Sequence, residues 1–502
     1  MELGELKRAW HEAVLKHEKE ILGLEMDLLS ICVRNRANYF TFVQTLYPMR
    51  FSIFSIFLIV STALIAQRPT EAQLRWHEHE FYLFLHFGPN TFTNVEWGHG
   101  TEAEDVFQPS ALDCKQWCRV AKAAGAKGLI ITAKHHDGFC LWPSAFSKHT
   151  VRESPWKNGQ GDVLQELSEA CREEGLLLGF YLSPWDRNHP QYGTPEYNEI
   201  YVQTMTELMT QYGDLFEFWW DGANGEGPNG KKQVYDFRRF EKVAAQVQSQ
   251  AVVFSDIGPG CRWVGNENGL VGETNWCTLD TAGFKRGLGA PSNDTLFHGN
   301  YNGAAWIPAE CDVSIRPGWF YHPEEDNKVK TKEQLLHIWL NSVGHGANLL
   351  LNVPPDRRGL IHPNDSAALV EFAALRKTLF GTNLAKAATV KTGKNRVETL
   401  TDALTTTFEA VENQWIQIEL PAEQPLKYLQ IKEHIANGQS VRQFEVEGWN
   451  AATQSYEPWG ASTTIGSRKI VALPEGATSS KLRVRVTAAK RWPVELSEIS
   501  LY

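Results

Sequence analysis

The sequence predicts an α/β fold: a (β/α)8-like barrel followed by an all-β sandwich domain. Between about residues 80 and 360, short and continuously apolar runs alternate with segments of helical periodicity. Such runs are typical of a parallel sheet that is buried on both faces. After residue 380 the helical patterns disappear, and apolar residues alternate with polar ones in segments such as WIQIEL, RQFEVEGWN and KLRVRVT. This second pattern indicates antiparallel strands with one face in water.

The helical segments carry start and stop signals. Asp162 with Gln165 opens an apolar face that Gly175 closes, and Thr331 with Gln334 opens a later one. An Asp or Thr followed three residues later by Gln satisfies the first free N–H groups of a helix, and Gly supplies the left-handed residue at its end. These signals place helices between the apolar runs.

The apolar runs give the expected strands. They are YLFLHF from Tyr82, GLIIT from Gly128, LLLGFYL from Leu176, LFEFWW from Leu215, AVVF from Ala251 and NLLLNV from Asn348. The number of such units favours a closed barrel. An open, doubly wound sheet is the alternative, although no glycine-rich nucleotide-binding turn follows the first run.

The N-terminal part contains an apolar stretch, Phe51–Ala66, that follows Met49 and Arg50. Its basic start, its length and the small residues near its end are typical of a signal peptide. We therefore expect four parts: a doubtful extension (1–48), a signal peptide (49–66), a catalytic barrel (67–380) and a discoidin-like sandwich (381–502). We therefore expect the protein to be exported to the periplasm or the extracellular space. We also expect Met49 to be the true start of translation, and no stable membrane insertion after the signal peptide is cleaved. The alternative is a genuine extension followed by an internal anchor.

Charge and cysteine content narrow the classes of function. The formal net charge is −10, which argues against a non-specific nucleic-acid binder, because phosphates call for a basic surface. Of the eight cysteines, Cys32 precedes the apolar stretch. The remaining number is odd, so at least one thiol stays free. Cys114 and Cys118 lack a second pair at zinc-binding spacing, which makes a structural zinc ion unlikely.

Polar residues recur where the expected strands end. Active sites of such barrels lie at the C-terminal ends of the strands. The residues found there are His86, Lys134, His135, His136, Asp137, Ser183, Trp185, Asp186, Asp221 and Asp256. A barrel without a site has no need of polar groups at every exit, so we expect the active site at this end.

Asp221 follows the aromatic run Phe218–Trp220, where the protein rather than bulk water sets its basicity. It could be a nucleophile, or simply a loop Asp before Gly222. Glycoside chemistry needs a second carboxyl group, and the loop RWVGNENG supplies Glu267. Retention of anomeric configuration requires the two carboxyl groups to lie roughly 5 Å apart. Glu273 and Asp256 are rival candidates for the acid.

The adjacent His135 and His136 allow three interpretations: hydrogen bonds to sugar hydroxyls, a structural role, or metal binding. Neighbouring residues on a strand point to opposite faces, so they would not ordinarily hold one ion together. Of the three interpretations, we place hydrogen bonds to sugar hydroxyls first, a structural role second and metal binding third.

Six strings, in this order and spacing, resemble the α-L-fucosidases of glycoside hydrolase family 29, and especially the branch that prefers α-1,3 and α-1,4 linkages: FLHFGPNTFTNVEWG, AKHHDGFCLWPS, GFYLSPWD, FWWDG, RWVGNE and RPGWFYH. The resemblance covers roughly residues 75–380. It implies a (β/α)8-like barrel that releases L-fucose by a retaining double displacement. It also implies fucosylated oligosaccharides or glycoconjugates as substrates, and neither a metal nor an organic cofactor.

The same resemblance assigns roles to particular residues. Asp221 matches the nucleophile and Glu267 the acid/base, whose position is the family's most variable feature. The matches to residues that hold the fucose hydroxyls or ring are His86, Glu96, Trp97, His135 and His136. Tyr181 and Trp219 match neighbours of the sugar, Trp319 matches a wall beside its methyl group, and Arg262 and Arg316 match less certain contacts.

Two alternatives remain at this level. A lectin-like protein on an inactive barrel would keep the histidines and tryptophans but could lose the carboxylates, so the presence of both Asp221 and Glu267 favours an enzyme. A fucosidase with α-1,2 or broad linkage preference is the other. In the C-terminal part, the order of the strand segments resembles galactose-binding-like, discoidin-type modules, which either bind sugar or only pack against the barrel.

Overall fold

The computed structural model describes residues 67–287, 289–393, 395–396 and 407–502. The predicted extension (1–48) and signal peptide (49–66) lie outside these ranges. Within them, no helix combines the length and apolar character needed to cross a membrane.

The first domain is a closed barrel of parallel strands. In order around the barrel the strands are β1 (Phe81–Leu85), β2 (Gly128–Lys134), β3 (Leu177–Leu182), β4 (Glu217–Trp219), β5 (Val252–Ser255), β6 (Cys261–Trp263), β9 (Ala309–Ser314) and β10 (Asn348–Asn352). β10 pairs with β1 and closes the ring, with Phe84 opposite Asn352 on one side and Ile130 on the other. The predicted barrel is confirmed, and the open-sheet alternative is wrong.

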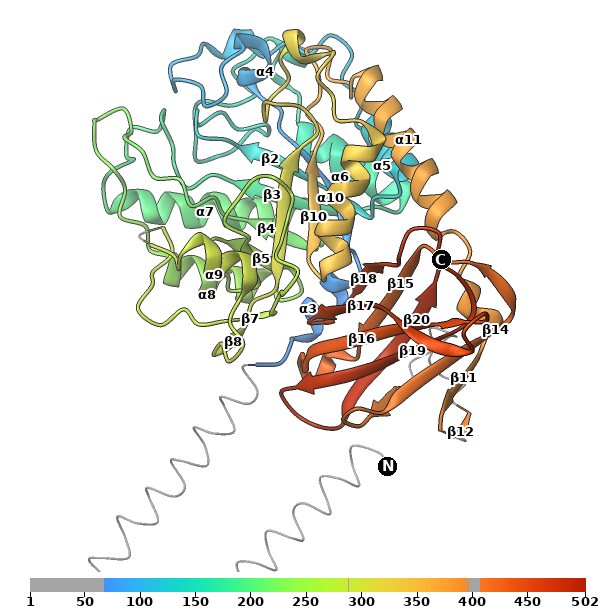
Figure 1. The fold of residues 1–502 in the computed structure, drawn as a ribbon. Helices are drawn as coiled ribbons and strands as arrows, with labels where there is room; N and C mark the ends of the chain where they lie inside the picture. Colours follow the sequence, from blue (N-terminus) through green and yellow to red (C-terminus); the bar gives the residue numbers. More distant parts are fainter. Residues whose placement is uncertain (1–66, 288, 394, 397–406) are drawn as a thin grey trace, which may run out of the picture. The chain divides into compact units, whose positions relative to one another are not determined.

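Helices surround these strands (Figure 1). They are α3 (Glu71–His77), α4 (Pro89–Thr93), α5 (Cys114–Ala124), α6 (Val163–Glu174), α7 (Glu196–Gln211), α8 (Phe237–Val247), α9 (Asn293–His298), α10 (Lys332–Asn341) and α11 (Pro363–Phe380). Short 3₁₀ turns lie at Glu104–Val106, Trp156–Gly159, Pro323–Glu325, Val343–His345, Leu384–Ala387 and Ile435–Asn437. The predicted caps form: Asp162 accepts a hydrogen bond from the Gln165 N–H, and Thr331 and Gln334 make a reciprocal capping box.

Two barrel strands, β6 and β9, carry no strand signal that we recognised in the sequence. β6 has only three residues and follows β5 through a short turn, with no helix between them. β9, with the sequence AECDVS, alternates polar and apolar residues although every one of them is buried. A polar residue at every second position of a buried strand means that polar groups face the barrel interior.

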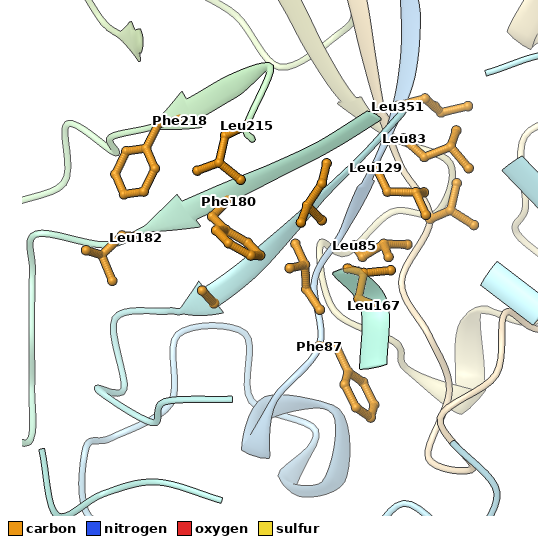
Figure 2. Close-up of a cluster of buried hydrophobic side chains, with 14 of the residues drawn as sticks. Leu83, Leu85, Phe87, Leu129, Leu167, Phe180, Leu182, Leu215, Phe218 and Leu351 are labelled. Carbon is orange, nitrogen blue, oxygen red and sulfur yellow. The ribbon is translucent and has the colours of Figure 1, made fainter. Parts of the chain in front are cut away.

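The barrel packs in two apolar layers. Leu83, Leu85, Leu129 and Leu351 point outward from the strands and meet residues of the helices, such as Leu167 of α6 (Figure 2). The inner layer contains Tyr82, Phe84, Ile130, Tyr181, Phe216, Trp219, Val252, Phe254, Cys261 and Leu350. Successive residues of a strand point to opposite faces, so the inner layer continues upward from Phe84 to His86, just beyond the end of β1.

The second domain consists of two antiparallel sheets. One sheet has the order β12 (Asn395–Arg396), β11 (Thr389–Thr392), β14 (Trp415–Pro425), β19 (Thr478–Ala489), β16 (Val441–Asn450) and β17 (Ser455–Thr463). The other has the order β13 (Phe408–Ala410), β20 (Val494–Leu501), β15 (Tyr428–Glu433) and β18 (Lys469–Ala472). A small ribbon of β7 (Thr278–Leu279) and β8 (Ala305–Trp306) belongs to the barrel loops. The all-β character predicted for this domain is confirmed.

The cysteines of the described residues are all free and buried. Cys118 and Cys171 come nearest to one another, with their sulfur atoms 3.9 Å apart on α5 and α6. Burial raises the pKa of the Cys140 thiol well above its usual range, so this group packs as a small apolar side chain.

Candidate active site

A cavity of about 180 Å³ lies at the C-terminal ends of the barrel strands. The catalytic and sugar-binding residues assigned from the sequence, apart from Arg262 and Arg316, line it: His86, Glu96, Trp97, His135, His136, Tyr181, Trp219, Asp221, Glu267 and Trp319. Phe84, Ala223 and Asp312 complete the lining. The fold thus brings together side chains from segments more than 230 residues apart, such as those of His86 and Trp319.

Asp221 comes two residues after β4 and is held by two hydrogen bonds. The Tyr181 hydroxyl donates to its Oδ2 over 2.9 Å, and the Ala223 N–H donates to its Oδ1 over 2.7 Å. Nε2 of His136 lies 3.8 Å from the same Oδ2. Burial and the adjacent Asp221 raise the pKa of Tyr181 well above its ordinary value, so this phenol stays neutral and keeps its proton for the bond. The carboxylate is therefore fixed in orientation at the cavity wall.

The three predicted histidines are buried and neutral. Nδ1 of His86 lies 2.8 Å from the side-chain oxygen of Asn352, and Nδ1 of His136 lies 2.7 Å from the Ser183 hydroxyl. Burial lowers the pKa of His86 to about 3 and of His136 to about 4, and it lowers that of His135 well below its usual range. Within the described residues, Nδ1 of His135 has no hydrogen-bond partner. Neutral imidazoles with free ring nitrogens suit sugar hydroxyls, which both donate and accept.

His135 and His136 both line the cavity, although they are adjacent in the sequence. Their ring centroids lie 4.0 Å apart. Our expectation that alternation would point them apart is wrong, because β2 ends at Lys134 and the chain turns at His136 and Asp137, so the two histidines lie beyond the strand. Side-chain direction alternates only within a strand.

Glu96 positions the segment that carries Trp319. Its Oε1 accepts the backbone N–H of Trp319 over 2.8 Å and lies 2.9 Å from Nε2 of His322. The indole N–H of Trp319 in turn donates to Oε2 of Glu267 over 3.2 Å. Glu267 itself is exposed, in the loop after β6. Trp97, 60% exposed, stands at the rim of the cavity with its ring edge toward His136.

Trp219 forms an aromatic wall of the cavity and is held on both faces. It stacks on Phe254 at 3.8 Å between ring centroids, nearly parallel at 7°, and on Tyr181 at 5.4 Å. Its indole N–H donates to Oε1 of Glu310 over 2.8 Å. Phe84 packs against the same indole. A flat ring fixed in this way offers the apolar surface that a sugar ring or methyl group requires.

Four candidate residues do not line the cavity. Arg262 donates to the carbonyl groups of Leu296 and Ile307, and Arg316 forms buried ion pairs with Asp365 and Asp326. Glu273 accepts a hydrogen bond from Ser462 of the sandwich over 2.7 Å. Asp256 is bonded to the N–H of Ile257 beside Gly222. Glu273 therefore points away from the cavity, and Asp256, although its carboxyl group lies close to Gly222, is not among the lining residues.

A buried pair of carboxyl groups, Glu217 and Glu310, lies below the cavity. Neither residue was predicted from the sequence. Trp76 donates to Glu217 over 2.7 Å, and the Tyr82 hydroxyl donates to Glu310. Burial raises the pKa of Glu217 to about 7, and burial together with the charge of Glu217 raises that of Glu310 further, so the pair holds at least one proton. The Cys261 sulfur lies close enough to make a geometric three-ligand group, but these internal hydrogen bonds already account for the carboxyl oxygens.

Asp312, which lines the cavity, also escaped the sequence reasoning. The signal that could have found it is the alternation in AECDVS, where Glu310, Asp312 and Ser314 fall on one face of β9. Without recognising the strand, that face cannot be assigned.

Comparison with known proteins agrees with this geometry. The family model described as alpha-L-fucosidase matches residues 66–377. Alpha-L-fucosidase 1 of Arabidopsis thaliana is 40% identical over 479 residues, covering 91% of this chain and 93% of the plant protein. A solved structure of a glycoside hydrolase 29 family member from an unknown rumen bacterium is 39% identical with a TM-score of 0.77, covering 87% of this chain and 77% of that one.

A second solved structure carries a ligand. The Ruminococcus gnavus GH29 fucosidase in complex with fucose is 31% identical with a TM-score of 0.79, covering 87% of this chain and 94% of that one. The family model spans the barrel that carries the cavity, and the relatives and solved structures cover most of the chain. The chain belongs to the α-L-fucosidases of glycoside hydrolase family 29 and is a glycoside hydrolase.

Proposed function

We propose that this α-L-fucosidase is an exo-acting retaining enzyme that removes terminal α-1,3- or α-1,4-linked L-fucose from glycans, with Asp221 as nucleophile and Glu267 as acid/base. The observation that carries the proposal is that these two carboxyl groups line one small cavity together with neutral histidines and aromatic rings. That combination is what double displacement at a single sugar requires.

The proposed reaction has two steps. Asp221 attacks the anomeric carbon and forms a fucosyl ester, while Glu267 gives its proton to the departing glycosidic oxygen. Water then attacks the same carbon, Glu267 takes a proton from it, and the bond to Asp221 breaks. Two inversions restore the original configuration, and both carboxyl groups return to their starting states.

The surroundings of the two carboxyl groups differ in the way these roles require. Asp221 accepts hydrogen bonds from Tyr181 and Ala223, which stabilise its ionised form and aim it. Glu267 lies in an exposed loop and accepts a hydrogen bond from the Trp319 indole N–H. The leaving group of a bound substrate can therefore approach Glu267 and receive its proton.

The cavity also fits the chemistry of fucose. Fucose carries ring hydroxyls and an apolar methyl group, and His86, His135 and Glu96 offer polar atoms while Trp219 and Trp319 offer aromatic surface. Phe84 and the stacked Trp219 close the bottom, which leaves room for one terminal sugar. The related R. gnavus fucosidase is known in complex with fucose.

The nucleophile is tested with an Asp221→Ala variant on an aryl fucoside. We expect a loss of about 10³-fold or more in kcat, since removing a nucleophile removes the covalent route. Asp256→Ala is the matched control, because Asp256 ends the next strand but does not line the cavity. Formation of a fucosyl azide by Asp221→Gly in the presence of azide would confirm that Asp221 is the nucleophile. Equal turnover of parent and Asp221→Ala would exclude the mechanism, and fucose binding by a parent without turnover would point to the lectin-like alternative.

Linkage preference needs a separate comparison. We expect faster release of fucose from a Lewis-type trisaccharide, with α-1,3 or α-1,4 fucose, than from 2′-fucosyllactose. Comparable rates on both would instead indicate a broad or α-1,2-directed enzyme.

Export is the last part of the proposal. The apolar stretch Phe51–Ala66 supports secretion to the periplasm or the medium. N-terminal sequencing of the exported protein should find a mature terminus close to Gln67. A terminus upstream of Met49 would contradict both the signal peptide and the suggested start.

A further inference from the structure

Asp312 is a further carboxyl group in the cavity that holds Glu96, Asp221 and Glu267. It lies on β9, between Cys311 and Val313, which point outward into the layer of helices. Its partner in the register of β10 is Leu350, a member of the inner layer. Alternation therefore turns the Asp312 side chain into the barrel, one step above Glu310 and facing the cavity.

The surroundings of Asp312 give its carboxyl group little compensation for a charge. The residue is 3% exposed, and within the described residues its Oδ1 accepts no hydrogen bond and no Lys or Arg forms an ion pair with it. An unpaired buried carboxylate costs several kcal/mol, a cost that is avoided when the group keeps its proton. Burial raises the pKa of Asp312 well above its ordinary value, and the neighbouring carboxyl groups of Glu267, Glu310 and Asp221 add to this effect.

We propose that Asp312 is a fucose-binding residue: a neutral carboxylic acid that donates its proton in a hydrogen bond to an oxygen of the bound fucosyl unit. The protein groups nearby already have donors, since Asp221 accepts from Tyr181 and Ala223, and Glu267 accepts from Trp319. The proton of Asp312 is therefore left for an oxygen that enters with the substrate. A neutral Asp312 also spares the nucleophile a further negative charge in the same small cavity.

The proposal rests on fucose occupying this cavity, and it can be tested by binding alone. Two ligands of the same shape separate a neutral from an ionised Asp312: L-fucose, which is uncharged, and a fucose-configured iminosugar, which is cationic near neutral pH. Affinities are measured by calorimetry for the parent, Asp312→Asn and Asp312→Ala. Cys311→Ala is the control, because it changes the same strand on its outward face.

Asp312→Asn keeps the shape and supplies an N–H in place of the O–H, so we expect both affinities to stay within about threefold of the parent. Asp312→Ala should weaken both ligands by about tenfold, the usual effect of losing one hydrogen bond. A selective loss of iminosugar binding in Asp312→Asn would mean that Asp312 is ionised, and unchanged fucose binding in Asp312→Ala would mean that it does not contact the sugar. Either result overturns the proposal.

A spectroscopic measurement avoids any dependence on the folding of the Ala variant. Infrared difference spectra of the parent against Asp312→Asn at neutral pH should show the carbonyl stretch of a protonated carboxylic acid in the parent only. A difference spectrum with carboxylate bands instead would contradict the neutral form. Absence of turnover in the parent would refute the proposed function while leaving these binding and infrared results interpretable.

Discussion

Two groups of cavity residues differ in how the protein holds them. His86, His135 and His136, here the histidine group, are all at least nine-tenths buried. Asn352 of β10 and Ser183, just beyond β3, fix two of the rings. Glu267 and Trp319, here the loop group, lie in the segments after β6 and β9, and a 3.2 Å hydrogen bond joins them. In the proposed mechanism, the strand ends fix the groups that bind the sugar before substrate arrives, while the loops present the proton to the leaving group.

This difference predicts that substitutions in the two groups will depend differently on the leaving group of the substrate. A rigid, buried histidine group should affect every fucoside alike, because all of them carry the same sugar. The exposed loop group should matter in proportion to how much the leaving group needs a proton. Substrates with good and poor leaving groups therefore distinguish the two groups experimentally.

The largest effect is expected for Glu267→Gln. General acid catalysis contributes about 10²–10⁴-fold, so kcat/KM on an unactivated fucosyl oligosaccharide should fall by about 10³-fold. When an aryl fucoside carries a strongly acidic phenol, the phenolate departs without needing a proton. Cleavage of its glycosidic bond should therefore slow by less than about tenfold. Initial rates on the two substrates measure the split.

Glu273→Gln is the matched control for this prediction, since Glu273 contacts Ser462 of the sandwich rather than the cavity. It should leave both rates near those of the parent. Equal losses on both substrates in Glu267→Gln would show that Glu267 supports the structure of the site but does not donate the proton.

His135→Ala tests the histidine group. The His135 ring lines the cavity, and its Nδ1 has no hydrogen-bond partner within the described residues, so we expect the ring to contact a sugar hydroxyl. Loss of such a bond in a buried site should lower kcat/KM by about 10- to 100-fold, to the same extent for activated and unactivated substrates. His189→Ala, a half-buried histidine outside the cavity, should have little effect on either. A loss confined to poor leaving groups would move His135 into the acid machinery and break the comparison.

The histidine group also predicts how stability depends on pH. Burial lowers the pKa of His86 from 6.5 to about 3. Between these values the unfolded chain binds a proton at His86 and the folded chain does not, so the stabilisation is complete above pH 6.5 and is lost as the pH falls toward 3. One such group changes the free energy of unfolding by up to about 1.4 kcal/mol per pH unit.

Urea unfolding of His86→Asn at pH 7, 6 and 5 measures this contribution. The variant should lose stability more slowly than the parent as the pH falls, so that the two curves converge. His337→Asn, which changes an exposed histidine of α10, should run parallel to the parent. A parallel curve for His86→Asn would mean that folding does not lower the pKa of His86.

Most of the barrel could be predicted from the sequence because its strands are buried on both faces and read as continuous apolar runs, while caps such as Asp162 mark the helices. β6 and β9 could not. β6 is too short to show a pattern, and β9 carries Glu310 and Asp312 inward, which gives it the alternation of a half-exposed strand. The rule that reads strands from apolar runs fails where the interior of the barrel is polar.

The candidate site divides in a similar way. His86, His135 and Asp221 could be found from strand ends alone, since the barrel rule places chemistry there. Glu96 and Trp319 lie in irregular segments without periodicity, and only the resemblance to a family pointed to them. Asp312 needed three-dimensional structure, because its position on the inward face of β9 is visible only once the register with β10 is known.

The smallest effect is expected for Trp319→Phe, and it tests the loop group most narrowly. The substitution keeps an aromatic ring at the cavity wall but removes the N–H that donates to Oε2 of Glu267. An exposed hydrogen bond of this kind contributes about 0.5–1 kcal/mol to holding Glu267 in place. Its loss should therefore lower kcat/KM on the oligosaccharide about two- to fivefold. The aryl fucoside should hardly change. Trp185→Phe, which removes an indole N–H bonded to the Glu226 carbonyl, is the control. Equal losses on both substrates would mean that Trp319 acts on the sugar itself, which would place it with the histidine group and leave Glu267 to be oriented by the substrate.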